Sequence, residues 1–255
     1  MKRLLPTWAS LLLFLLFMTQ GIIAQKKTMS WTTSSKEARE IAGKGAAHMM
    51  NIEFAQAYQQ FERALELDPD FTVVLTLMAN LSNGETKKKY VERAFASAKN
   101  KTEGEQLFVK LVTPENKQAD NQKLWADLYN MFPDGSFIGF FYTITRPTPE
   151  EQFAAAQEYH KKFPDVAPIH NILGYMYLQV KKDNATAKQH FEKYVELYPT
   201  GCNPYDSFGE FYFITGDMVN AEKYYRLALE KYPFNTSSIE KLNEIKIAKS
   251  KAKAD

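Results

Sequence analysis

A short motif recurs at a fixed interval, and this recurrence constrains the fold more than any other feature of the 255-residue chain. The tetrapeptides GFFY, GYMY and GEFY begin at Gly139, Gly174 and Gly209, so each step is 35 residues. A constant period between roughly 20 and 50 residues is typical of proteins that stack copies of one supersecondary unit. The sequence therefore predicts a repeat architecture.

Each repeat is predicted to be a pair of helices. Alternation of apolar and polar residues, which would favour strands, is nearly absent. In the last repeat Phe208, Phe211 and Tyr212 share one helical face. Ala221 and Tyr225 share another face after an intervening Gly-Asp pair. Both patterns have the helical period, so we expect an all-α chain.

Prolines mark where each second helix ends, because proline cannot continue a helix. The five prolines in this position are Pro69, Pro133, Pro164, Pro199 and Pro233. Their separations are 64, 31, 35 and 34 residues, and the first is close to two units, so we expect six units. The predicted helix pairs are 34–50 and 53–67, 70–82 and 84–99, 102–113 and 117–131, 134–145 and 148–163, 165–181 and 183–198, and 202–215 and 217–232, followed by a last helix over 237–252.

The last helix suits the end of a stack. Ile239, Leu242 and Ile245 lie on one side of it and lysines on the other, so one face can close the stack while the other meets water. The predicted fold is a right-handed solenoid of stacked antiparallel helix pairs over 34–235, with a C-terminal capping helix and charged tail over 236–255.

These units resemble the tetratricopeptide repeat, a helix-turn-helix unit of about 34 residues. The sixth unit carries residues at the signature spacings of that family, namely Tyr205, Phe208, Gly209, Tyr212, Gly216, Ala221, Tyr225, Ala228 and Pro233. The first and fifth units match well, although the fifth has one extra residue in its turn. Units two and three are degenerate, and their register is open.

The glycines of the recurring motif have a physical reason. Gly174 and Gly209 are predicted to lie where the first helix of a unit meets the second, and a side chain there would hold the two axes apart. Overpacking of this kind typically costs about 1–3 kcal/mol. Phe191 and Tyr225 on the second helices are expected to fill the space between units.

The N-terminus is predicted to be a secretory signal peptide over residues 1–24. Lys2 and Arg3 precede an apolar stretch at 11–18, and the small residue Ala24 stands before the expected cut. Residues 25–33 are then a linker. The chain would be exported, to the periplasm or outside the cell.

An uncleaved membrane anchor over 4–24 is the alternative, although Pro6 and several polar residues make this stretch a poor transmembrane helix. After cleavage we expect no membrane span. Loss of Lys2 and Arg3 would lower the formal net charge from +2 to zero, and a neutral chain has no general attraction for nucleic acid.

The sequence offers no template for catalysis, a cofactor or a metal. The four histidines are His48, His160, His170 and His190, and no two are four residues apart on one helix. Phosphate loops and nucleophile elbows are absent from the sequence, and the single cysteine excludes an intramolecular disulfide. We therefore expect a protein that binds rather than an enzyme.

The resemblance implies that the first helices line a concave face that receives a segment of a partner protein. Carried over by position, the residues of this groove are Phe140, Ile144, Tyr175, Leu178, Gln179, Asp206, Glu210, Phe213 and Ile214. The leading hypothesis is an adaptor that holds another protein. The alternative is a binder of a small ligand or glycan, which would need an enclosed pocket with converging polar groups.

Overall fold

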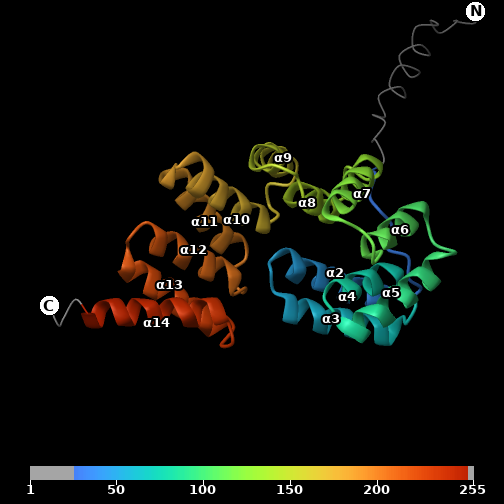
Figure 1. Cartoon of the computed structure of the whole chain (residues 1–255), viewed down its shortest axis with the longest axis horizontal. Helices are drawn as coiled ribbons and strands as arrows, with labels where there is room; N and C mark the ends of the chain where they lie inside the picture. The colour runs from blue at the N-terminus through green and yellow to red at the C-terminus, as the bar shows by residue number, and fades with distance from the viewer. Residues whose placement is uncertain (1–25, 252–255) are drawn as a thin grey trace, which may run out of the picture.

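The computed structural model describes residues 26–251, and all regular structure in that part of the chain is helical. The predicted signal peptide lies outside the described residues. Figure 1 shows the helices along a strongly curved path, which rises from α2 through α7, crosses at α8 and α9, and descends to α14. No helix within 26–251 is both long enough and apolar enough to span a bilayer.

The helices pair as the sequence predicts. Their bounds are α2 (Lys36–Met50), α3 (Phe54–Leu67), α4 (Thr72–Asn80), α5 (Gly84–Ala98), α6 (Glu103–Phe108) with the 3₁₀ turn η1 (Val109–Val112), α7 (Gln118–Met131), α8 (Ser136–Ile144), α9 (Pro149–Lys162), α10 (Pro168–Tyr175) with the π-helical turn η2 (Met176–Lys181), α11 (Asn184–Leu197), α12 (Asn203–Ile214), α13 (Met218–Lys231) and α14 (Thr236–Lys251). When η1 and η2 are counted with the helices they extend, every end lies within three residues of its prediction. The molecule is an all-α helical-repeat solenoid.

Close approach of the two helices in the fifth and sixth units depends on a glycine beneath an aromatic ring. A Cβ atom added to Gly174 would lie 2.8 Å from the Phe191 ring, and one added to Gly209 would lie 2.9 Å from the Tyr225 ring. Phe191 and Tyr225 are fully buried. The predicted role of these glycines is therefore confirmed.

Polar side chains at the helix starts fix where the second helices begin. Thr148, Asp183 and Asp217 each accept a hydrogen bond from a backbone N–H in the first turn of α9, α11 and α13, at 3.0–3.2 Å. Such caps satisfy donors that have no partner inside the helix. The second helices α9, α11 and α13 are thus each delimited by a cap at the start and a proline just beyond the end.

The segment before α2, expected to be a linker, lies against the third and fourth units. The Lys27 N–H donates to Asp134 at 2.8 Å, and Thr32 donates through its N–H and its hydroxyl to Glu105 at 2.8 and 2.7 Å. The Trp31 ring meets Phe137 edge to face, with 5.4 Å between ring centres. Residues 27–32 are therefore part of the packed structure.

Candidate binding site on the inner face

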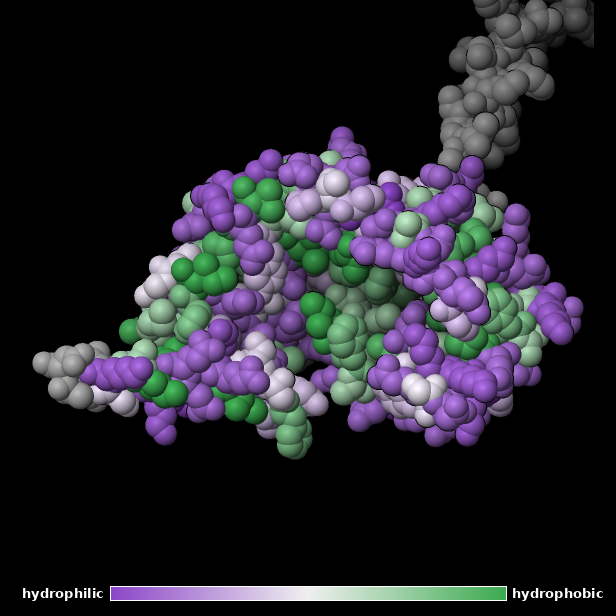
Figure 2. All heavy atoms as spheres, viewed as in Figure 1, coloured by the Kyte–Doolittle hydropathy of each residue, from purple (hydrophilic) through white to green (hydrophobic). Residues whose placement is uncertain are grey.

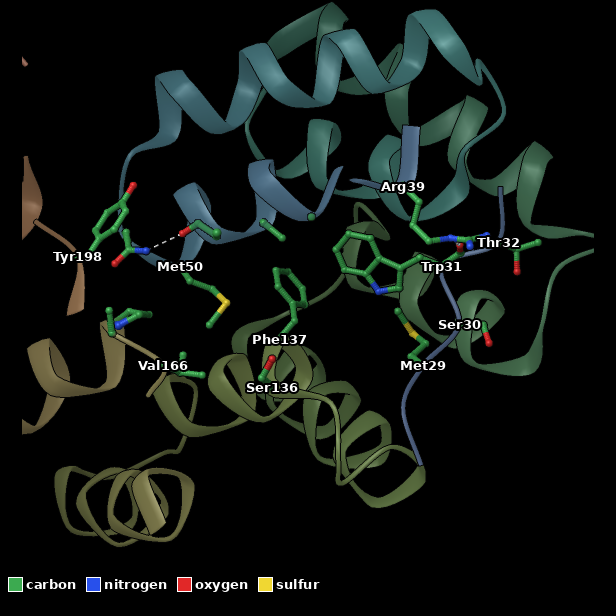
Figure 3. A pocket seen from close by; sticks show the side chains of 16 residues that line it. Met29, Ser30, Trp31, Thr32, Arg39, Met50, Ser136, Phe137, Val166 and Tyr198 are labelled. Carbon is green, nitrogen blue, oxygen red and sulfur yellow. Dashed lines mark hydrogen bonds between the residues drawn. The ribbon is translucent and has the colours of Figure 1, made fainter. Parts of the chain in front are cut away.

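A cavity of about 940 Å³ opens on the inner side of the curve. Figure 2 shows a hollow at the centre of the molecule with apolar residues deep inside it. Figure 3 shows Met29, Trp31, Met50, Phe137 and Val166 around this space. These residues come from the N-terminal segment, α2, α8 and the turn before α10, so the cavity exists only because the chain curves back on itself.

Two of the polar side chains beside the cavity, Arg39 and Asn51, already have partners within the chain. The Arg39 guanidinium donates to the carbonyl oxygens of Trp31 and Thr33 at 3.3 and 3.0 Å. The Asn51 amide donates to the Ala47 carbonyl at 2.8 Å and accepts from the Tyr194 hydroxyl at 2.8 Å. Because these groups are occupied, the cavity offers mainly apolar contacts to an occupant.

One side of the cavity is closed by a contact between the first unit and the fifth and sixth units, which we call the closure contact (His48, Asn51, Glu53, Tyr194, Tyr198 and Cys202). The Glu53 carboxylate accepts from the Tyr198 hydroxyl at 2.6 Å, from the Cys202 N–H at 3.0 Å and from His48 Nδ1 at 2.7 Å. Figure 1 shows the first unit and α12 facing each other across this junction. The contact joins residues about 145 positions apart in the sequence.

The ionised form of Glu53 is favoured by its surroundings, which suits it to accept the hydrogen bonds of the closure contact. Burial raises the pKa of its carboxyl group, but the hydrogen bonds from His48, Tyr198 and the Cys202 backbone outweigh burial and lower the pKa below the ordinary glutamate value. Burial raises the pKa of the Cys202 thiol to about 11, so this thiol is protonated and unreactive at neutral pH.

Two residues of the predicted groove lie in the core. Phe140 and Leu178 are only 3% and 5% exposed. Ile144 is partly buried and packs against the main core. Their positions on the first helices follow the repeat pattern, but these side chains pack between helices and do not form an open surface.

The other predicted groove residues either contact a neighbouring first helix or α14, or are exposed. The Tyr175 hydroxyl donates to Glu210 at 2.5 Å, which joins the fifth and sixth units. Asp206 accepts from the Ser238 hydroxyl at 2.5 Å, and Lys241 lies 4.7 Å from the centre of the Phe213 ring. Gln179 and Ile214 are exposed. None of the nine predicted residues lines the central cavity.

Three of the four histidines meet in the fourth and fifth units, which sequence spacing did not predict. His160 of α9, His170 of α10 and His190 of α11 have ring centres 4.8, 5.2 and 5.9 Å apart. Burial lowers the pKa of His170 and, with the neighbouring histidines, lowers that of His190 to about 4. As placed among residues 26–251, no three histidine, cysteine, aspartate or glutamate side chains are arranged to hold a metal ion.

The arrangement of helices can be compared with solved structures. A chain of the APC/C heterotetramer Cut9–Hcn1 is 14% identical, with a TM-score of 0.51, and the match covers 82% of this chain and 42% of that one. Together with the period of 34 to 35 residues and the glycine-under-ring packing, this likeness decides the architecture. The fold is that of the tetratricopeptide repeat.

Two further tetratricopeptide-like structures match over nearly their full length. PilW, a type IV pilus biogenesis factor, is 13% identical, with a TM-score of 0.48 and coverage of 81% of this chain and 99% of that one. A thermophilic tetratricopeptide protein of Thermus thermophilus is 17% identical, with a TM-score of 0.39 and coverage of 82% and 99%. No family model and no curated protein matches the sequence.

Proposed function

We propose that this tetratricopeptide-fold protein is a non-catalytic scaffold that holds an apolar segment of another protein in its central cavity. The observation that carries the proposal is the cavity itself, about 940 Å³ in volume and walled by Met29, Trp31, Met50, Phe137 and Val166. Buried aromatic and aliphatic anchors supply most of the binding energy at protein interfaces. A wall of this kind suits apolar side chains of a partner.

The way in which the chain binds its own N-terminal segment supports the proposal that the partner segment is extended. Residues 27–32 run without helix along the inner face, and the Trp31 ring lies against Phe137 there. Glu105 binds both the backbone and the side chain of Thr32. The inner face therefore already holds one extended segment by an aromatic side chain and by hydrogen bonds to its backbone.

Export is part of the proposal. The pattern of residues 1–24 supports cleavage after Ala24 and a mature protein in the periplasm or outside the cell. N-terminal sequencing of the native protein tests this. A chain that still begins at Met1 and stays in the membrane fraction would contradict it.

The cavity can be blocked without removing any native contact. A Cβ atom added to Gly43 meets nothing within 4 Å, and Gly43 lines the cavity. We therefore expect Gly43→Trp to abolish capture of the partner from the native envelope fraction, while circular dichroism and thermal unfolding stay unchanged. Lys44→Trp is the matched control, because Lys44 is exposed on the same helix and lies outside the cavity wall.

The surface predicted from the sequence remains in the proposal as a flanking contact, and it can be tested separately. Capture that survives Gly43→Trp would exclude the cavity. If capture then fails in Tyr175→Ala with Phe213→Ala, and that variant still folds, the partner binds along the fifth and sixth units. Loss of folding in that variant would assign both rings to the core, where Tyr175 already contacts Phe191.

A small apolar ligand is a second candidate, because the cavity volume falls in the range of about 300–1,000 Å³ that is usual for ligand pockets. A glycan finds less support, since Arg39 and Asn51 at the wall already bond to backbone carbonyl oxygens of the chain. Mass spectrometry of the native protein after organic extraction separates the two candidates: a stoichiometric small molecule favours the ligand, and a co-purifying protein favours the scaffold.

A further inference from the structure

Residues 27–32, which we call the strap, are held by the solenoid in the manner of a bound peptide. They form no regular structure and border the central cavity, where Figure 3 shows Trp31 beside Phe137 of α8. Within the strap Met29 is buried and Trp31 is half-buried, whereas the remaining residues are exposed. A short segment with so few buried groups can separate from the repeats without unfolding them.

The main chain of the strap is bound near both ends. The Lys27 N–H donates to the Asp134 carboxylate at 2.8 Å, and the Asp134 N–H donates to the Lys27 carbonyl oxygen at 3.1 Å. Near the other end, the Arg39 guanidinium donates to the Trp31 carbonyl oxygen at 3.3 Å. Contacts to the main chain give affinity for an extended segment, and contacts to side chains give specificity. These bonds would therefore hold another segment in the same place.

Glu105 recognises the side chain at one position of the strap. This carboxylate is fully buried, at 0% exposure, and accepts from the N–H and the hydroxyl of Thr32 at 2.8 and 2.7 Å. Two further bonds come from the N–H and the hydroxyl of Thr102, at the start of α6. A buried acceptor that loses its donors costs free energy. The site therefore selects a residue with a hydroxyl group, and threonine or serine supplies both donors.

An aromatic surface recognises the residue before Thr32. The Trp31 ring meets Phe137 edge to face, with 5.4 Å between ring centres, and Phe137 is itself packed among Phe108 and Trp125. Aromatic pairs in this geometry stabilise a contact beyond the area that they bury. An aromatic side chain directly before the hydroxyl residue therefore fits the site.

We propose that the strap is a built-in competitor for the partner: a partner segment with an aromatic residue directly followed by threonine or serine displaces residues 27–32 from the inner face. This selection rests on the proposed scaffold function, since only a scaffold that binds a partner segment has a use for a competitor. The strap continues into α2 through residues 33–35, and so short a connection gives it an effective concentration of about millimolar or more. A partner overcomes this advantage by also placing apolar side chains in the central cavity, which the strap only borders.

A labelled synthetic peptide with the sequence of residues 26–33 tests the proposal on the full mature chain. In Met29→Ala with Trp31→Ala the strap loses both apolar anchors and leaves its site free. We expect this double variant to bind the peptide about tenfold more tightly than the wild-type chain, in which the strap competes. Thr28→Ala is the matched control, because Thr28 is exposed in the same segment, and it should bind the peptide as weakly as wild type.

Changed peptides test the two side-chain requirements in the double variant. The Trp31→Ala peptide lacks the ring that meets Phe137. The Thr32→Val peptide keeps the shape of the side chain but lacks the hydroxyl that donates to Glu105. Each should bind about tenfold more weakly than the unchanged peptide, whereas the Thr28→Ala peptide should bind equally well.

Absence of peptide binding in the double variant, or equal binding in that variant and the wild-type chain, would overturn the proposal. Should the double variant lose its helical circular dichroism, hydrogen exchange of the wild-type chain decides. Millimolar peptide should speed exchange of the Thr32 N–H, which is released from Glu105, while α2 keeps its protection, and an unchanged Thr32 N–H would refute displacement. Capture that still depends on Gly43 would then leave the scaffold function standing, with the strap as a fixed part of the wall.

Discussion

Two glycines on α2 show how the neighbours of a residue decide its role. A Cβ atom added to Gly45 would lie 2.6 Å from the Phe61 ring, whereas one added to Gly43 would meet nothing within 4 Å. Gly45 meets the ring of Phe61 as Gly174 meets that of Phe191 and Gly209 that of Tyr225, so its close contact follows the repeat pattern. Gly43 carries no sequence signal, and only the structure shows that it lines the cavity.

Substitution by alanine at these two positions should have opposite effects on the free energy of unfolding. Gly43→Ala should raise the free energy of unfolding by up to about 1 kcal/mol, because alanine favours the helix and the space is open. Gly45→Ala should lower it by about 1–3 kcal/mol, because the ring of Phe61 must move. Urea unfolding of both variants measures this. Equal effects in the two variants would contradict the packing described here.

Several residues of the predicted groove are covered by neighbouring side chains, for a reason that also lies at the residue scale. Position in the repeat predicts which helix face a residue occupies, but not whether its neighbour covers it. Tyr175 and Glu210 bond to each other, and Asp206 bonds to Ser238 of α14. These pairings depend on the distance between adjacent helices, which the spacing of residues in one unit does not specify.

At the scale of elements, the extra residue of the fifth unit has a structural consequence. The end of its first helix widens into the π-helical turn Met176–Lys181, and Lys182 follows in the left-handed conformation with φ 57°. A π-helical turn is the usual way to insert one residue into an α-helix. The second helix of the unit, α11, therefore keeps its place in the stack.

The capping helix α14 has one buried side, as predicted. Ile245 is 2% exposed and packs with Ala221 and Tyr225 of α13, whereas Ile247 is 56% exposed. Ile239, which was expected on the buried side, is 39% exposed. The cap therefore rests on a narrower apolar strip than the sequence pattern indicated.

Truncation of each of these two isoleucines should show which face of α14 contributes to stability. Ile245→Ala should lower the free energy of unfolding by about 2–4 kcal/mol, because it leaves a void between α14 and α13. Ile247→Ala should change it by less than about 0.5 kcal/mol, as is usual for exposed sites. Chemical denaturation followed by circular dichroism measures both. A large loss in Ile247→Ala would mean that α14 packs through its other face.

At the scale of the whole molecule, the closure contact converts an open stack into a closed curve. Tandem helix pairs need contacts only with adjacent units. Here Glu53 and Asn51 of the first unit bond to Tyr198, Cys202 and Tyr194. The central cavity and the closure contact share Asn51 and Tyr198, so closure helps to form the proposed binding site.

The closure contact should weaken in acid, because the Glu53 carboxylate becomes protonated. Its pKa is lowered in the folded chain, so its contribution to stability is complete above the ordinary glutamate pKa of about 4.3 and is lost as the pH falls through the folded value. Glu53→Gln should lower the free energy of unfolding by about 1–3 kcal/mol at pH 7, because three donors lose a charged acceptor. The difference from wild type should shrink toward pH 3.

Urea unfolding at pH 7 and in acid, with small-angle scattering at pH 7, measures this effect. The radius of gyration should increase in Glu53→Gln while helicity is retained. Glu66→Gln is the control, because Glu66 is exposed on α3 and outside the closure contact. A difference from wild type that does not depend on pH would show that the Glu53 carboxylate does not maintain closure through its charge.

Residue patterns within single units were enough to predict the helices, their pairing and the positions where glycine meets an aromatic ring. These depend on helical periodicity, proline and side-chain size within about 35 residues, and all of them can be read from one unit. The curvature became visible only in the three-dimensional arrangement of the units, and with it the cavity, the closure contact and the meeting of His160, His170 and His190. Small rotations between successive units add up along the stack, so residues far apart in sequence meet at positions that no local spacing specifies.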